Sequence, residues 1–182
     1  MWIANFFTLF LIFLPAFLAN ASPVVAKNIP IIRELSWPIH ERFFGKNKTV
    51  RGLITGILVG MITGLLLYFC RHIFVRFLTN YTTIYNLYHD WKQAMLVGGT
   101  IAAGALVGDM GKSFVKRRLG KKPGSMFQPW DGIDYMIGAI IFMLPWYTVS
   151  IWGAIFLLII GPLLSLMMNT IAYSIGWKEC WY

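Results

Sequence analysis

The residues best suited to chemistry lie close together between positions 109 and 134. They are Asp109, Lys112, Ser113, Lys116, Arg117, Asp131 and Asp134. Carboxylates supply the oxygen ligands that Mg²⁺ prefers, whereas lysine and arginine side chains bind the oxygens of phosphate groups. Such a site suits phosphate chemistry, which asks mainly for positioning and electrostatic stabilisation. The sequence therefore predicts a magnesium-dependent site for a phosphorylated substrate.

The first five of these residues fall on one face of a helix. At 100° per residue, they share an arc of about 140°, and Arg118 points away from it. A basic flank at the end of a membrane helix is the simpler interpretation of residues 116–122, but it explains neither Asp109 nor the shared face. We therefore predict catalytic roles for these residues: Asp109, Ser113, Lys116 and Arg117.

The two later aspartates suggest a metal site. Asp131 and Asp134 stand at positions i and i+3, so they would be adjacent on one helical face. One or two carboxylates together with substrate phosphates commonly hold Mg²⁺. Acidic residues at a helix N-terminus are also favourable in themselves, which explains either aspartate but less easily both together with Asp109. We predict Mg²⁺ as the cofactor and Asp109, Asp131 and Asp134 as its ligands.

The composition indicates what kind of element must position these residues. Apolar residues make up 58% of the chain and charged residues 13%, with a mean hydropathy of +0.65. These values indicate an integral membrane protein and exclude a soluble globular domain. The net charge of +9 does not indicate nucleic acid binding, because the basic residues cluster between hydrophobic runs. Anionic lipid head groups and nucleotide phosphates are the partners that this distribution favours.

Hydrophobic runs predict about five membrane-spanning helices. They are expected over residues 2–19, 53–69, 94 onward, 135–144 with flanking residues, and 151–173. The first resembles a signal peptide, but it is long and no basic residue precedes it, so a retained span that ends at Asn20 and Pro23 is favoured. The third run has only 14 apolar residues, about 21 Å, which is shorter than a bilayer core of about 30 Å. The membrane-spanning helix must therefore include the turns that carry Asp109. The predicted fold is all-α, a polytopic membrane protein in a single domain over residues 1–182.

Glycines at regular spacing predict which spans pack together. Gly52, Gly56, Gly60 and Gly64 repeat every four residues in the second predicted span, and the third is also rich in glycine and alanine. Small residues at this spacing let two membrane helices approach closely. We expect these glycines to serve packing rather than chemistry.

The basic residues also predict an orientation. Residues 23–51 and 112–122 each carry six Lys or Arg and the C-terminus carries one, against three in residues 71–92. Because basic loops stay on the cytoplasmic side, the N-terminus is expected outside and the site on the cytoplasmic face of the cell membrane.

The central motif resembles a known family. Its pattern is Gly108-Asp109, Lys112-Ser113, Lys116-Arg117-Arg118, Gly120 and Lys122-Pro123-Gly124, followed by Asp131 and Asp134. It is similar to the CDP-archaeol synthase family, which is related to the phosphatidate cytidylyltransferases. The resemblance extends to Ala19-Asn20-Ala21-x-Pro23, to residues 45–52 and to residues 169–178. Val50 and Ser165 depart from the family pattern, where Trp and His are common.

The resemblance implies a CTP-dependent reaction. A lipid phosphate, archaetidic acid (2,3-bis-O-geranylgeranyl-sn-glycerol 1-phosphate), would attack the α-phosphorus of CTP to give CDP-archaeol and pyrophosphate in phospholipid biosynthesis. The residues that it implies for substrate binding are Asn20, Lys48, Arg51, Lys112, Arg118, Lys122 and Gly124. The implied partners are CTP, the lipid phosphate and the bilayer, with no nucleic acid, and a homodimer is left open.

Three other functions compete with this interpretation. A phosphatidate cytidylyltransferase would act on diacyl lipids, which the generically apolar spans do not distinguish. A CDP-alcohol phosphotransferase would need Ala-Arg after Asp131-Gly132 and two further aspartates downstream, and the sequence has neither. A non-enzymatic protein that binds anionic lipids through its basic loops would have no need of Asp109, Asp131 or Asp134.

Overall fold

The protein is built from helices. The computed structural model describes residues 2–27, 36–75, 81–121 and 132–177, and no strand occurs among them. The helices are α1 (Trp2–Ile12), α2 (Leu14–Ala26), α3 (Glu41–Phe44), α4 (Val50–Val75), α5 (Tyr81–Leu87), α6 (Trp91–Arg118), α7 (Asp134–Met143) and α8 (Ile151–Ser174). The predicted all-α fold is confirmed.

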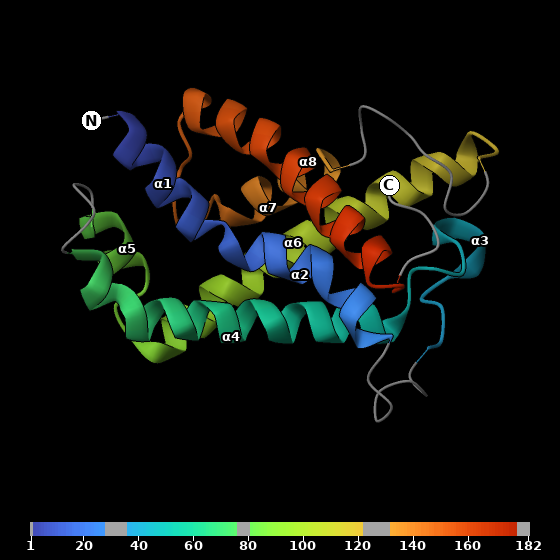
Figure 1. Cartoon of the computed structure of the whole chain (residues 1–182), viewed down its shortest axis with the longest axis horizontal. Coiled ribbons are helices and arrows are strands. Elements are labelled where there is room, and N and C mark those ends of the chain that lie inside the picture. Colours follow the sequence, from blue (N-terminus) through green and yellow to red (C-terminus); the bar gives the residue numbers. More distant parts are fainter. Residues whose placement is uncertain (1, 28–35, 76–80, 122–131, 178–182) are drawn as a thin grey trace.

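The long helices run back and forth along the molecule. The passes formed by α1 and α2 together, α4, α6, α7 and α8 alternate in direction (Figure 1). The C-terminal ends of α2, α6 and α8 therefore gather at one end, together with α3 and the start of α4. Helix α5 and the turn between α7 and α8 lie at the other end. This alternation brings segments that are far apart in the sequence to a single polar end.

In the described part of the chain, three helices are long and apolar enough to cross a membrane by themselves. These are α4, α6 and α8, and α1 with α2 forms a fourth candidate span that is bent by 46°. Helix α7 has only 10 residues, about 15 Å, which is half the thickness of a bilayer core. The chain is therefore a membrane protein with several passes, and α7 is shorter than a span requires by itself. The break predicted at residues 145–148 does separate α7 from α8.

The first span does not end where the sequence suggested. The helical run breaks at Phe13 and then continues past Asn20 and Pro23 to Ala26, so the predicted end is wrong. Pro23 has no N–H to donate to the Ala19 carbonyl, but the Ser22 hydroxyl donates to that carbonyl instead, at 2.9 Å. The local cost of the proline is thereby reduced and the helix persists.

Helix α6 packs tightly against α4 through the predicted glycine repeat. A Cβ atom added at Gly60 would overlap Ala102 and lie 2.7 Å from the carbonyl oxygen of Gly98. One added at Gly64 would overlap the backbone at Ala94. The two helix axes can approach this closely only because these side chains are absent. The predicted pairing of the second and third spans is confirmed.

A second face of α6 packs equally closely against α7. A Cβ added at Gly108 would lie 3.2 Å from the Cα of Gly138 and would overlap the backbone of Asp134. One added at Gly104 would lie 2.8 Å from the ring of Phe142. These contacts bring the first turn of α7 against the charged part of α6.

The glycine interface gives a direct test of the packing. Gly60→Ala should lower the free energy of unfolding by about 1–3 kcal/mol, because the new methyl group overlaps backbone that cannot move aside. Gly111→Ala on α6 is the matched control, because nothing lies within 4 Å of its added Cβ. The control should be neutral or stabilising by up to about 1 kcal/mol. Thermal unfolding in detergent measures both, and equal stability of the two variants would contradict the interface.

Candidate active site

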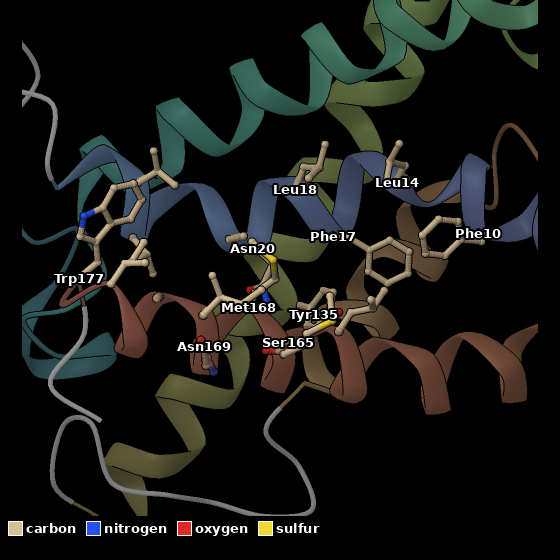
Figure 2. A pocket seen from close by; sticks show the side chains of 18 residues that line it. Phe10, Leu14, Phe17, Leu18, Asn20, Tyr135, Ser165, Met168, Asn169 and Trp177 are labelled. Carbon is tan, nitrogen blue, oxygen red and sulfur yellow. The ribbon is translucent and has the colours of Figure 1, made fainter. Parts of the chain in front are cut away.

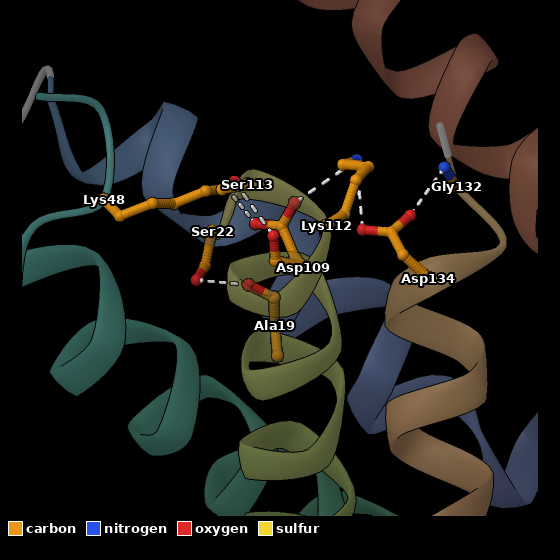
Figure 3. A network of polar contacts seen from close by, with 8 residues as sticks. All are labelled: Ala19, Ser22, Lys48, Asp109, Lys112, Ser113, Gly132 and Asp134. Carbon is orange, nitrogen blue, oxygen red and sulfur yellow. Dashed lines mark hydrogen bonds and ion pairs between the residues drawn. The ribbon is translucent and has the colours of Figure 1, made fainter. Parts of the chain in front are cut away.

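Four charged side chains form a continuous chain of ion pairs at the polar end. The Lys48 ammonium group donates to Oδ2 of Asp109, and Lys112 Nζ lies 3.4 Å from Oδ1 of the same carboxylate. Lys112 Nζ also lies 3.0 Å from Oδ2 of Asp134. One lysine thus bridges two aspartates from different helices, as Figure 3 shows.

This cluster is largely shielded from solvent. The exposed fractions of the side chains are 23% for Lys48, 19% for Asp109, 15% for Lys112 and 9% for Asp134. Taking a charge out of water is expensive unless an opposite charge stands beside it. Positive and negative charges alternate along this cluster, and this alternation offsets the cost of burying each of them.

Local geometry fixes each member of the cluster. Asp109 and Lys112 stand three residues apart on α6, so they share a face of the helix. The close contact at Gly108 sets α7 beside that face, and Oδ1 of Asp134 accepts a hydrogen bond of 2.9 Å from the Gly132 amide. Gly132 has φ of 101°, a conformation that favours glycine, and it forms the turn that begins α7.

Lys48 reaches the cluster through a short pairing of two loop segments. The Ile39 amide donates to the Lys48 carbonyl at 2.8 Å, and the Val50 amide donates to the Trp37 carbonyl at 3.0 Å. Pro38 and Thr49 form an isolated antiparallel bridge between them. This pairing fixes the backbone immediately before α4 begins, and so directs Lys48 toward α6.

The three basic residues in the last turn of α6 have different surroundings. Lys116 is buried, with 7% of its surface exposed. Arg117 packs against Gly45, which ends α3 with φ of 83°. Arg118 leaves this face, as predicted, and its guanidinium lies 5.1 Å from the ring centre of Phe114 and 5.7 Å from that of Phe43. Arg118 therefore anchors α3 through cation–π contacts, and its role in substrate binding stays a prediction.

The other residues that the sequence predicts for the site are not among the four of the ion-pair cluster. Arg51, in the first turn of α4, is buried, with 7% of its surface exposed. The Ser113 hydroxyl donates to the backbone carbonyl of Asp109 at 3.0 Å and does not donate to its carboxylate. Asn20 faces an apolar groove between α2 and α8. Three predicted residues lie outside the described part of the chain: Lys122, Gly124 and Asp131.

The donor set fits Mg²⁺, although the described residues contain no group of three His, Cys, Asp or Glu side chains that could hold a metal ion. The two available carboxylates belong to Asp109 and Asp134, and both offer oxygen, the donor that Mg²⁺ prefers. Oδ2 of Asp134 is buried, and the contact that the described residues give it is the Lys112 ammonium at 3.0 Å, although a carboxylate oxygen can accept two partners. That oxygen therefore has coordinating capacity left for a cation.

Comparison with known proteins identifies the family. The family described as "CarS-like: CDP-archaeol synthase" matches residues 2–182. The chain belongs to the CDP-archaeol synthase family. A CDP-archaeol synthase of Thermococcus kodakarensis is 34% identical over 98% of this chain and 97% of its own length. One of Methanosarcina barkeri is 35% identical over 91% of this chain and 98% of its own length.

A solved structure supports the same assignment. It is described as "Structural insight into an intramembrane enzyme for archaeal membrane lipids biosynthesis". It is 31% identical to this chain, with a TM-score of 0.64, and the match covers 88% of this chain and 91% of the other. This CDP-archaeol synthase family member is therefore an enzyme, a nucleotidyltransferase of membrane lipid biosynthesis. A purely non-enzymatic lipid-binding role is excluded.

The bridging lysine can be tested by its effect on stability. Lys112→Met should lower the free energy of unfolding by about 3–5 kcal/mol, because it leaves two buried carboxylates without their shared cation. Adding Asp134→Asn should recover part of this loss, because it removes the one carboxylate of the cluster left without a cation while Asp109 keeps Lys48.

Lys46→Met is the matched control for this measurement. Lys46 also pairs with a carboxylate, that of Glu41 at 3.5 Å, but 77% of its side chain is exposed. Its loss should change stability by less than about 1 kcal/mol. If the two lysine variants unfold at the same temperature, the bridge contributes nothing to stability.

Proposed function

We propose that this protein transfers a cytidylyl group from CTP to a lipid phosphate, archaetidic acid, giving CDP-archaeol and pyrophosphate. The observation that carries the proposal is the buried cluster in which Lys112 bridges Asp109 and Asp134, close to further buried cations at one end of a bundle of membrane helices. Membership of the CDP-archaeol synthase family supports the choice of substrates.

The reaction is a displacement at phosphorus. A phosphate oxygen of the lipid attacks the α-phosphorus of CTP and forms a new P–O bond. The bond from that phosphorus to the oxygen that bridges the α- and β-phosphates breaks, and pyrophosphate leaves with the electron pair. No covalent intermediate with the protein is needed, so the side chains act by positioning and by stabilising charge.

Cationic side chains would hold the phosphates. Lys48, Lys112 and Lys116 supply ammonium groups, and Arg117 supplies a guanidinium that suits phosphate geometry. These groups lie where water is largely excluded, which strengthens their attraction to the charge that develops on the equatorial oxygens. Binding of a phosphate would draw Lys112 away from one of its two carboxylates and leave that carboxylate open.

Asp134 and Asp109 would hold Mg²⁺, with Asp131 as the further ligand that the sequence predicts. When bound, the ion would neutralise charge on the triphosphate and on the leaving pyrophosphate. Within the protein, the Gly132 amide holds the Asp134 carboxylate by its Oδ1 atom, so that Oδ2 stays oriented toward Lys112.

Isotopic labelling tests the reaction and Asp134 together. Label at the α-phosphorus of CTP should appear in the lipid and label at the γ-phosphorus in pyrophosphate, with archaetidic and phosphatidic acids offered side by side. Asp134→Asn keeps the size of the side chain and an oxygen for the Gly132 amide, but removes the charge that would hold the metal. Turnover should fall by about two orders of magnitude or more while the protein stays folded.

Asp90→Asn provides the control for this substitution. Asp90 caps α6 at the opposite end of that helix, where it accepts from the amides of Lys92 and Gln93, and asparagine caps equally well. This variant should retain wild-type turnover. Near wild-type rates for Asp134→Asn at limiting magnesium would exclude its role in metal binding, and no transfer of α-label into any lipid would exclude the reaction itself.

We also propose that the polar end faces the cytoplasm. The start of α4, the end of α6 and α3 lie together at this end (Figure 1), and residues 42–51 and 112–121 carry nine of the 16 Lys and Arg residues. In a variant without Cys70 and Cys180, Ser36→Cys and Ser125→Cys should both react with a membrane-impermeant thiol reagent from the cytoplasmic side only. Ser150→Cys, at the start of α8, should react from the outside. Labelling of positions 36 and 125 from opposite sides would contradict a shared site.

A further inference from the structure

An apolar groove runs between α2 and α8, outside the ion-pair cluster. Its volume is about 190 Å³, and its walls extend from Phe10 to Val25 on one side and from Leu164 to Trp177 on the other (Figure 2). At 1.5 Å per helical residue, the part of this wall on α2, from Leu14 to Val25, is about 17 Å long. The half-thickness of a bilayer core is about 15 Å, so the groove is long enough for one extended hydrocarbon chain of a lipid.

The lining of the groove changes in character along its length. Phe10 and Phe17 form an aromatic end, Asn20 and Asn169 lie near the middle, and Val25 and Trp177 line the far end (Figure 2). The end with Phe10 points away from the polar end of the molecule, toward which the C-terminal parts of α2 and α8 run. A hydrocarbon chain between Phe10 and Asn20, with its polar head beside the two asparagines, would match this order of side chains.

The groove also adjoins the ion-pair cluster through adjacent residues of α7. Tyr135 lines the groove, and its neighbour Asp134 is bound to Lys112. The Tyr135 hydroxyl donates to the Gly161 carbonyl at 2.8 Å, which fixes the first turn of α7 against α8. Helix α2 makes a similar connection, because Asn20 lines the groove while α2 also packs against α6, the helix that carries Asp109 and Lys112.

From this continuity we infer that the groove between α2 and α8 binds one hydrocarbon chain of the lipid phosphate substrate, with its phosphate directed to the Lys112 cluster. The inference rests on the proposed function and adds the surface that recognises the chain. Isoprenoid and acyl chains share the chemistry that this apolar lining accepts, so the experiment must distinguish them.

Filling the groove should impair long-chain substrates selectively. Ser165→Phe on α8 and Ala21→Phe on α2 place a ring in the groove from opposite walls. The substrates are glycerol phosphates with two geranylgeranyl, two oleoyl or two butyl chains. In each variant, the ratio of kcat/KM for a long-chain substrate to kcat/KM for the butyl substrate should fall about tenfold, with the change mainly in KM for the lipid rather than for CTP.

Ile159→Phe is the matched control, since Ile159 is an exposed residue of α8 that does not line the groove. Its ratio should equal that of the wild type. A fall for geranylgeranyl, for oleoyl or for both identifies the chain that is bound, and each of these supports the inference. Unchanged ratios in both filled variants, with stable folded protein, overturn it. A wild-type protein that transfers label to none of the substrates overturns the proposed function instead.

A measurement on the unaltered protein removes any dependence on folding of the variants. A glycerol phosphate whose chain carries a terminal photoreactive diazirine is bound to wild-type protein, and the labelled peptides are then identified by mass spectrometry. Labelling in residues 10–18 of α1 and α2 or 164–168 of α8 supports the inference. Labelling confined to other helices, competed by excess unlabelled lipid phosphate, overturns it.

Discussion

The close approach of α6 to two other helices is the constraint on which the rest of the structure depends. Gly98 and Gly60 meet on the side of α4, and Gly108 and Gly138 meet on the side of α7. Without a hydrophobic force to drive helices together inside a bilayer, such contacts depend on shape. The same approach sets Asp134 within ion-pair distance of Lys112. Packing and chemistry therefore share one interface, and a change in helix separation would alter both.

Part of this arrangement could be predicted because it is local. The helical repeat places Asp109 and Lys112 on one face of α6, and the four-residue glycine repeat identifies the face of α4 that packs. The family resemblance, read from the same motif, agrees with the comparisons over the whole chain. Fold class, the enzyme class and the shared face of Asp109 and Lys112 thus follow from residues that are near one another in the sequence.

The rest depends on contacts that no local pattern encodes. Lys48 is 61 residues from Asp109, and it is directed there by a pairing of two loop segments that show no alternation of apolar and polar residues. The persistence of α2 past Pro23 depends on the packing of that proline against Gly52 of α4, in addition to the local hydrogen bond from the Ser22 hydroxyl. The direction of Asn20 follows from which side of α2 meets α8. Each of these outcomes is decided by tertiary packing.

The sign of the charges in the ion-pair cluster bears on how the chain enters a membrane. Two lysines and two aspartates cancel, so Lys48, Asp109, Lys112 and Asp134 together carry no net charge. A lone ion carried toward the bilayer interior by the translocation machinery would face a cost of several kcal/mol, which a neutral set avoids. Biogenesis of the protein therefore need not wait for nucleotide, lipid or metal, because the polypeptide supplies its own counter-ions.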